Sequence, residues 1–100
     1  MSPRSIRFAR RATDDLRAAI AYSELKWGDN QSRRYEEAIW KQLDLLAYFP
    51  ARGPVVGPAF GELRWVRSGR HMIYYRYNDE TETIVRIQHD RLRLLPEDVE

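Results

Sequence analysis

The sequence predicts an α+β fold in which a helical hairpin packs on one face of a small antiparallel sheet. Apolar residues recur at helical spacing in the first half of the chain and at every second position in much of the second half. A stretch rich in proline and glycine separates the two halves. With 43% apolar residues among 100, the chain has one modest core, so we expect a single domain with its core in residues 5–91 and a C-terminal tail in 92–100.

A short strand and a first helix are expected at the start. Residues 5–9 alternate between apolar and polar side chains, which is typical of a strand with one buried face. Thr13 offers an oxygen as an N-cap, while Asp14 and Asp15 place negative charge in the first helical turn. Gly28 is positioned to end this helix. The side chains at helical spacing are Leu16, Ile20, Ser23 or Glu24, and Trp27.

A second helix is expected over residues 31–49, with Asp29 as a candidate cap. Two helices joined by so short a connection must pack as an antiparallel hairpin. Trp27 and Trp65 both have positions available in the core. The apolar face of the second helix comprises Tyr35, Ile39, Leu43, Leu46 and Phe49.

The second half predicts a three-stranded antiparallel meander after a surface loop at residues 50–61. The tail shows no regular pattern, and Pro96 argues against a helix running through it. The three strands are expected over residues 63–67, 71–77 and 83–89.

The two faces of the middle strand predict different roles. Ile73 and Tyr75 are expected in the core, whereas Tyr74 and Arg76 are expected on an open face. Such a face is either a recognition surface for nucleic acid or protein, or a solvated face with cross-strand ion pairs such as Arg76 with Glu82. The neighbouring strands add Arg64 and Arg86 to this face.

Arginine dominates the basic residues, with 15 Arg against 2 Lys and a net charge of +2. The guanidinium suits carboxylates, phosphates and aromatic faces, although a GC-rich genome produces the same bias, and both explanations stay open. Without cysteine, and with two histidines, we expect no disulfide, no metal site and no cofactor. No segment is apolar for long enough to be a signal peptide or a membrane span, so we expect a cytoplasmic protein.

The order of elements and several local patterns resemble the RelE/ParE superfamily of toxins from type II toxin-antitoxin systems. The patterns follow one another in the family's order over about residues 5–91, and this order gives the resemblance its specificity. In the helical half they are Asp15-Leu16, Ile20-Ala21-Tyr22, Trp27-Gly28 and Leu46-Ala47-Tyr48-Phe49-Pro50. In the strand half they are Leu63-Arg64, Ile73-Tyr74-Tyr75-Arg76-Tyr77 and Val85-Arg86-Ile87-Gln88-His89-Asp90-Arg91.

The resemblance implies a toxin that a cognate ParD-like antitoxin binds and silences in a hetero-oligomer. It is greatest to the ParE branch, whose members inhibit DNA gyrase without known hydrolytic chemistry, so we do not expect an enzyme. RelE-like members instead cleave messenger RNA on the ribosome, and Arg64, Arg86 and His89 are the candidates for such a site. The sequence departs from the RelE pattern because no tyrosine follows Tyr77. A third alternative is an inactive member that acts in an autoregulatory complex.

Seven residues are candidates for binding the antitoxin or the target. Trp40 lies about 100° around the second helix from the apolar stripe, so we expect it to contact a partner. His71, next to a turn, is expected to be a plain surface residue, and His89 to lie at the end of a strand. The seven candidates are Trp40, Arg64, Arg67, Tyr74, Arg76, Arg86 and Arg91.

Overall fold

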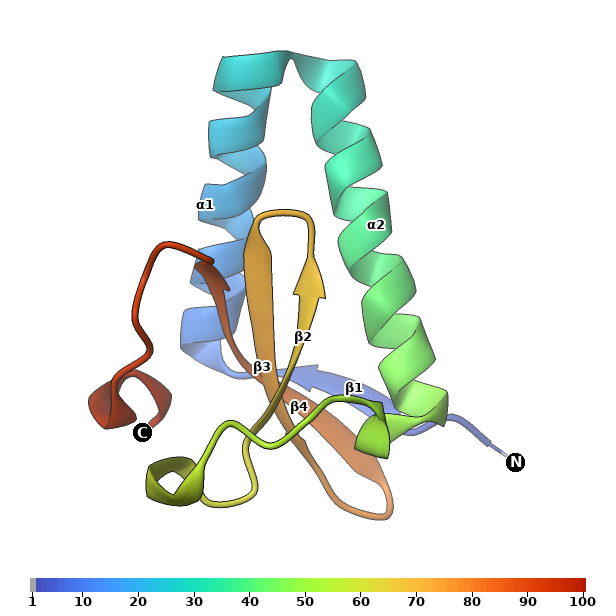
Figure 1. Ribbon diagram of the computed structural model, residues 1–100. Helices are drawn as coiled ribbons and strands as arrows, with labels where there is room; N and C mark the ends of the chain where they lie inside the picture. Colours follow the sequence, from blue (N-terminus) through green and yellow to red (C-terminus); the bar gives the residue numbers. More distant parts are fainter. Residues whose placement is uncertain (1) are drawn as a thin grey trace.

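The computed structural model describes residues 2–100 and contains a four-stranded sheet with two long helices packed against it (Figure 1). The order strand, helix, helix and three strands confirms the predicted fold class. The strands are β1 (Ser5–Phe8), β2 (Arg64–Ser68), β3 (His71–Tyr77) and β4 (Thr81–His89). The helices are α1 (Arg10–Trp27) and α2 (Asp29–Tyr48), with short 3-10 helices η1 (Pro50–Arg52), η2 (Pro58–Phe60) and η3 (Pro96–Val99).

The sheet is mixed rather than wholly antiparallel. Its strand order is β1-β4-β3-β2, and β3 pairs antiparallel with both β2 and β4, which confirms the predicted meander. β1 joins the other edge of β4 in parallel, with Ser5 opposite Thr81 and Phe8 opposite Ile84. The helical hairpin supplies the long crossover that a parallel pair requires. The alternation in residues 5–9 predicts a buried face but neither the partner nor the direction of this strand.

Gly28 connects the two helices. Its φ angle is 87°, and its amide donates to the Glu24 carbonyl at 3.0 Å, so α1 ends there as predicted and α2 begins at the next residue. Glycine adopts this conformation without the strain that a side chain would bring. The predicted cap at Thr13 is wrong. Thr13 lies within the first turn, where its amide donates to the Ala9 carbonyl at 3.1 Å, and α1 already begins at Arg10.

The main core lies between the hairpin and the sheet. The stripe on α2 predicts Ile39, Leu43 and Leu46, and all three are fully buried. Ile73 and Tyr75 of β3 are fully buried on the same face, as the strand alternation predicts. The other buried members are Ala12, Val66, Ile84 and Ile87.

Two aromatic residues expected in the core are exposed. Phe49 is 58% exposed because α2 ends at the residue before it, and its φ of −128° and ψ of 68° take it off the helical stripe. Trp27 is 62% exposed because the closed end of the hairpin projects past the β2–β3 turn (Figure 1). The hairpin is therefore longer than the sheet that it covers.

The hydroxyl of Tyr75 anchors the loop between α2 and β2. This buried hydroxyl donates to the Pro50 carbonyl at 2.6 Å and accepts from the Gly53 amide at 3.0 Å. A β-carbon at Gly53 would collide with the carbonyl oxygen of Trp65, so the close approach requires glycine. The predicted proline and glycine loop is thus fixed to the sheet at its first turn.

A second, smaller apolar cluster lies on the other face of the sheet. Tyr74 is 7% exposed and packs there with Leu63, Val85 and Val99. The prediction that Tyr74 lies on an open face is wrong, because the C-terminal tail folds back over the sheet and brings Val99 into this cluster (Figure 1). A bulge in the pairing of β3 with β4 leaves Val85 without a partner in the register and turns it toward the cluster.

Asp15 joins α1 to the edge of β4. β1 pairs with β4 only as far as Ile84, so the amide of Ile87 needs another acceptor, and Asp15 Oδ2 accepts it at 2.9 Å. The same carboxylate accepts from Arg86 Nε at 2.7 Å and Nη2 at 3.0 Å. This hydrogen bonding raises the pKa of Arg86. Only 12% of the Arg86 side chain and 16% of the Asp15 side chain are exposed, so the pair is largely removed from solvent.

The same ion pair holds the tail. Arg86 Nη1 donates to the Asp98 carbonyl at 3.2 Å, and Arg11 Nη1 donates to the Glu97 and Asp98 carbonyls at 3.0 and 3.2 Å. The Asp98 carboxylate accepts the Leu95 amide at 2.8 Å, which starts η3. Pro96 occupies the first turn of η3, where an amide donor is not needed. Residues 92–100 are therefore an ordered part of the fold.

A carboxyl group without a hydrogen-bond partner within residues 2–100 lies in the core. Glu82 of β4 is fully buried, and both its carboxylate oxygens lack a partner. Burial, with a smaller contribution from Asp44, raises its pKa to about 7, against the opposing effect of Arg4. The Arg76–Glu82 pair, considered as one alternative for this face, is not formed, because Arg76 lies opposite Thr83 and is exposed.

The substitution Glu82→Gln tests whether this carboxyl is neutral in the folded state. Its pKa rises from 4.5 to about 7 on folding, so the stability of the parent should fall as the pH rises between these values. Gln does not ionise, so its stability should not depend on this titration. The free energy of unfolding of the variant minus that of the parent should therefore be greater at about pH 8 than at about pH 4, by on the order of 3 kcal/mol. Urea denaturation at both pH values measures this gain. The exposed Glu80→Gln is the control, and a gain independent of pH would contradict a neutral Glu82.

The Asp15–Arg86 ion pair should stabilise the fold far more than a surface pair. Arg86→Ala leaves a largely buried carboxylate unpaired, so we expect the free energy of unfolding to fall by about 2–4 kcal/mol. Arg67→Ala removes an ion pair whose arginine is 52% exposed, and the loss should stay below about 1 kcal/mol. Urea denaturation followed by tryptophan fluorescence compares the two variants, and equal small losses would refute the structural role of Arg86.

Candidate functional site

The structure separates the three residues of the messenger RNA nuclease hypothesis. Arg64 lies on the helix-covered face of β2, where its Nη1 donates to a loop carbonyl at 2.6 Å. Arg86 lies on the other face and is bound by Asp15. His89 pairs with His71, which is four positions along β3, or roughly 13 Å, from the partner of Arg64. The three side chains therefore do not converge on one phosphate group.

Accessibility divides the seven candidates for partner binding. Tyr74 and most of Arg86 are enclosed by the tail, and Arg64 is partly buried against the loop. Trp40 is 38% exposed, and its ring centre lies 5.7 Å from that of Phe8, so β1 covers one side of it and the other stays open. The candidates that remain accessible are Trp40, Arg67, Arg76 and Arg91.

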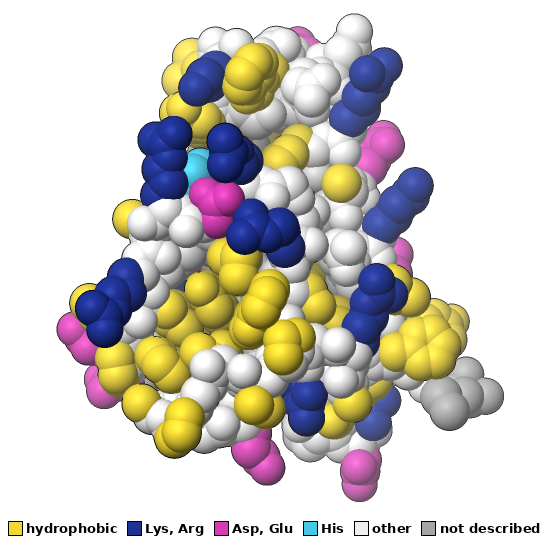
Figure 2. Space-filling view, viewed as in Figure 1, with side chains coloured by type: hydrophobic (Ala, Val, Ile, Leu, Met, Phe, Trp, Pro, Cys, Tyr) yellow, Lys and Arg dark blue, Asp and Glu magenta, His cyan; other side chains and the backbone are white. Residues whose placement is uncertain are grey.

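Asp90 gathers basic residues at the end of β4. Its Oδ2 lies 2.8 Å from Arg67 Nη1 and 3.5 Å from Arg70 Nη1, and its Oδ1 lies 3.1 Å from His89 Nδ1. The hydrogen bond from Arg67 is the main reason that the pKa of Asp90 is lowered. Figure 2 shows this group as a cluster of basic side chains around an acidic side chain and a histidine. The surface there is basic even though Asp90 is ionised.

His71 is not the plain surface residue that its place beside a turn predicts. It is half-buried, and its Nδ1 is hydrogen-bonded to the hydroxyl of Tyr35, which also donates to the Ser68 carbonyl at 3.2 Å. The rings of His71 and His89 meet edge to face at 5.5 Å. Burial is the main cause of a lowered pKa for His71, and His89 adds to it. His71 is therefore neutral at physiological pH.

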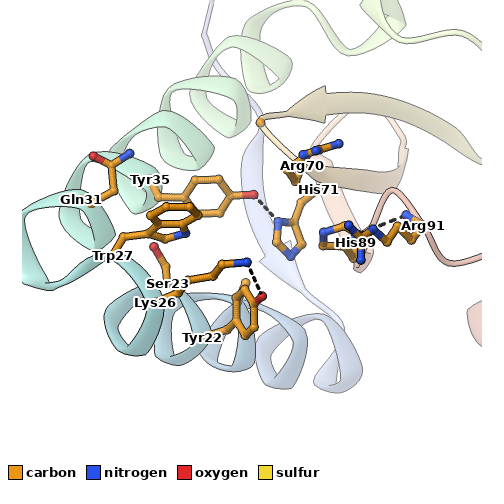
Figure 3. A pocket seen from close by; sticks show the side chains of 12 residues that line it. Tyr22, Ser23, Lys26, Trp27, Gln31, Tyr35, Arg70, His71, His89 and Arg91 are labelled. Atoms are coloured by element: carbon orange, nitrogen blue, oxygen red, sulfur yellow. Dashed lines mark hydrogen bonds between the residues drawn. The ribbon is translucent and has the colours of Figure 1, made fainter.

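These histidines line a cleft between the closed half of the hairpin and the β2–β3 turn (Figure 3). The cleft has a volume of about 430 Å³, with Tyr22, Lys26 and Trp27 on the α1 side and Arg70 and Arg91 on the sheet side. Lys26 Nζ donates to the Tyr22 hydroxyl at 3.2 Å and lies 5.3 Å from the centre of the Trp27 ring. None of the described residues that line the cleft is acidic, so its surroundings are basic and aromatic.

Sequence reasoning misses most of this cleft. Tyr35 and Trp27 are predicted only as core residues, and Lys26 and Arg70 carry no pattern of their own. The one available signal is the pairing of two strands that each bear a histidine, His71 and His89. This signal also depends on the bulge between β3 and β4. Without the bulge, the register that begins with Tyr77 opposite Glu82 would place His71 opposite Gln88 and not opposite His89.

Neither a metal centre nor a membrane span is found among residues 2–100. The acidic and histidine side chains there form no group of three that would hold a metal ion. None of the described helices combines the length and apolarity needed to cross a bilayer.

The chain is related to known toxins along most of its length. Residues 6–93 match the family described as the ParE toxin of the type II toxin-antitoxin system parDE. Toxin ParE1 of Caulobacter vibrioides is 30% identical over 86 residues, which make up 86% of this chain and 88% of that relative. A chain of the chromosomal ParDE toxin-antitoxin system from P. aeruginosa has a TM-score of 0.72 at 18% identity, over 86% of this chain and 95% of its own length.

A chain of the toxin-antitoxin complex RelBE2 from Mycobacterium tuberculosis shares the fold with a TM-score of 0.66 at 23% identity, over 88% of this chain and 99% of its own length. Both structural likenesses show the fold, while the family match runs from β1 into the C-terminal tail. The chain therefore belongs to the ParE toxin family of type II toxin-antitoxin systems, within the RelE/ParE superfamily.

Proposed function

We propose that this toxin inhibits DNA gyrase and that a cognate antitoxin silences it by direct binding. The match of residues 6–93 to the ParE toxin family carries the proposal, because the ParE branch is the one whose resemblance implies gyrase as the target. The two structural neighbours come from a ParDE system and a RelBE2 toxin-antitoxin complex, which supports an antitoxin partner for this chain as well.

The geometry favours inhibition by binding over hydrolysis. Cleavage of a phosphodiester needs a general base, a general acid and a free cation within hydrogen-bond reach of one phosphate. Arg86 is neutralised by Asp15, and Arg64 faces the opposite side of the sheet. The nuclease alternative therefore has no supporting arrangement among Arg64, Arg86 and His89 within residues 2–100.

The edge of β2 fits an extended antitoxin segment. The loop covers this edge only as far as Trp65, through the Val56 amide to the Leu63 carbonyl at 2.8 Å and the Trp65 amide to the Pro54 carbonyl at 3.1 Å. Because alternate residues point the same way, Arg67 presents its backbone amide and carbonyl to that same edge. A segment that pairs there would add a strand to the sheet.

The side chains beside this edge define the chemistry of the segment. Trp65 and Met72 are only partly buried on the outer face, which Figure 2 shows as an apolar hollow next to the basic cluster. Arg67 and Arg70 flank the hollow from the strand and the turn. An amphipathic segment with acidic residues would complement both features, and Trp40 is exposed for further contact on the helical side.

A supercoiling assay tests the proposed target. Purified toxin should stop gyrase from supercoiling relaxed plasmid or make it accumulate cleaved DNA, and addition of the antitoxin should restore supercoiling. Relaxation of the same plasmid by a type I topoisomerase should be unaffected, which controls for toxin that simply binds DNA. Unchanged gyrase activity with a toxin preparation that still arrests cell growth would contradict the proposal.

A parallel assay addresses the nuclease alternative. In cell-free translation, messenger RNA should stay intact with the parent toxin. Codon-linked cuts that disappear in both Arg64→Ala and His89→Ala would instead favour cleavage on the ribosome.

Charge reversal tests the proposed antitoxin surface. We expect a reading frame beside that of the toxin to encode the antitoxin, and its product should form a stable complex with the purified chain. Arg67→Glu should weaken that complex by about tenfold or more, because it opposes an acidic segment at the edge of β2. Arg17→Glu, on the exposed side of α1, is the matched control and should bind like the parent. Equal affinity of both variants would rule out this edge as the antitoxin site.

A further inference from the structure

The proposed gyrase and antitoxin interactions do not account for the cleft between the hairpin and the β2–β3 turn. Its volume of about 430 Å³ falls within the range of small-molecule sites, roughly 300–1,000 Å³. Its walls come from α1, α2, the β2–β3 turn and the end of β4 (Figure 3). The cleft is therefore formed by tertiary packing and does not depend on one loop.

Basic groups reach this cleft from three separate elements. Lys26 comes from α1, Arg70 from the β2–β3 turn and Arg91 from the segment after β4. Lys26 and Arg91 form no salt bridge within residues 2–100. Arg70 lies 3.5 Å from Asp90, but that carboxylate is bound more closely by Arg67 at 2.8 Å. The basic groups thus exceed the acidic ones, and a compact anion would complement them.

Aromatic rings form the second part of the lining. Tyr22 is 56% and Trp27 62% exposed, although large apolar side chains of this kind usually lie inside a protein. The ammonium of Lys26 lies 5.5 Å and 5.3 Å from the centres of these two rings, so the basic and aromatic groups adjoin each other. A planar base can stack on such rings.

Polar side chains from α2 and the sheet close one end of the cleft. Tyr35 is hydrogen-bonded to His71, and the His71 ring meets His89 edge to face. The Nε2 atoms of the two imidazole rings have no hydrogen-bond partner within residues 2–100 and can meet the edge of a base, whereas Lys26, Arg70 and Arg91 are exposed. A ligand with an anionic end and a planar polar end would use all three parts of the lining.

We propose that this cleft binds a phosphorylated nucleoside, with the phosphate among Lys26, Arg70 and Arg91 and the base against Tyr22 and Trp27. The same chemistry has two sources, a free nucleotide or the phosphorylated end of a nucleic acid strand. The proposal is independent of the gyrase target, because binding to this cleft is measured on the toxin alone.

Isothermal titration calorimetry of the purified chain tests the proposal. Adenosine monophosphate should bind with a Kd between about 10 μM and 1 mM. The Kd for adenosine alone, and that for inorganic phosphate alone, should be at least about tenfold higher. A 5'-phosphorylated tetranucleotide that binds tighter than the mononucleotide identifies a strand end as the source, whereas equal or weaker binding identifies the free nucleotide. Either result supports the site.

Matched variants locate the binding. Lys26→Ala and Arg91→Ala should each weaken nucleotide binding about tenfold, and Trp27→Ala about tenfold through lost stacking. Lys41→Ala and Arg93→Ala, of the same type but outside the cleft, should bind within about twofold of the parent. Circular dichroism confirms that each variant is folded.

Three outcomes would overturn the inference. The first is the absence of nucleotide binding up to about 5 mM. The second is an equal loss of affinity in the variants inside and outside the cleft. The third is tighter binding of a hexaglutamate peptide than of any nucleotide, which would make the cleft a site for acidic peptides.

Discussion

The carboxylate of Asp15 is the group on which the arrangement of this chain depends. β1 has four residues and β4 has nine, so the parallel pairing ends at Ile84 and leaves the rest of that β4 edge without a strand. Asp15 supplies the missing acceptor to Ile87 and binds Arg86 at the same time. One side chain therefore fixes α1 against the sheet and fixes the guanidinium that holds the tail. The tail in turn completes the second apolar cluster through Val99.

This constraint decides which surfaces are left for partners. Arg86, on the part of β4 beyond the end of β1, is a candidate phosphate ligand when only the strand pattern is considered, but its charge is matched by Asp15 and its outer side is covered by the tail. Tyr74 is enclosed in the same way. The surfaces that stay accessible lie away from Arg86 and Tyr74, at the edge of β2 near Arg67 and in the basic cleft under the hairpin tip.

Local periodicity predicts the parts of the structure that depend on near neighbours in the sequence. Helical spacing identifies the buried stripe through Ile39, Leu43 and Leu46, strand alternation identifies Ile73 and Tyr75, and Gly28 marks the end of α1. These positions are determined by residues within one or two turns or by the pleat of a single strand. The family and its fold class are predicted for the same reason, since the local patterns occur in a fixed order.

The features that escape prediction all depend on distant contacts. Trp27 has the right spacing for a core position, but no strand extends beneath the end of the hairpin. Tyr74 alternates outward as expected, and only the return of the tail buries it. The bulge that turns Val85 outward also aligns His71 with His89, and its only trace in the sequence is a spacing of three between the core residues Ile84 and Ile87, which is too short a signal to identify a bulge.

Hydrogen exchange at the Ile87 amide tests most directly whether Asp15 organises this fold. In Asp15→Ala, the protection of Ile87 against exchange should fall by at least about tenfold more than that of Ile73 in the main core, because only the edge loses its acceptor. The resonances of Val99 should also change as the tail loses the fixed position of Arg86. Equal losses at Ile87 and Ile73, or unchanged protection at Ile87, would contradict the central place given to this carboxylate.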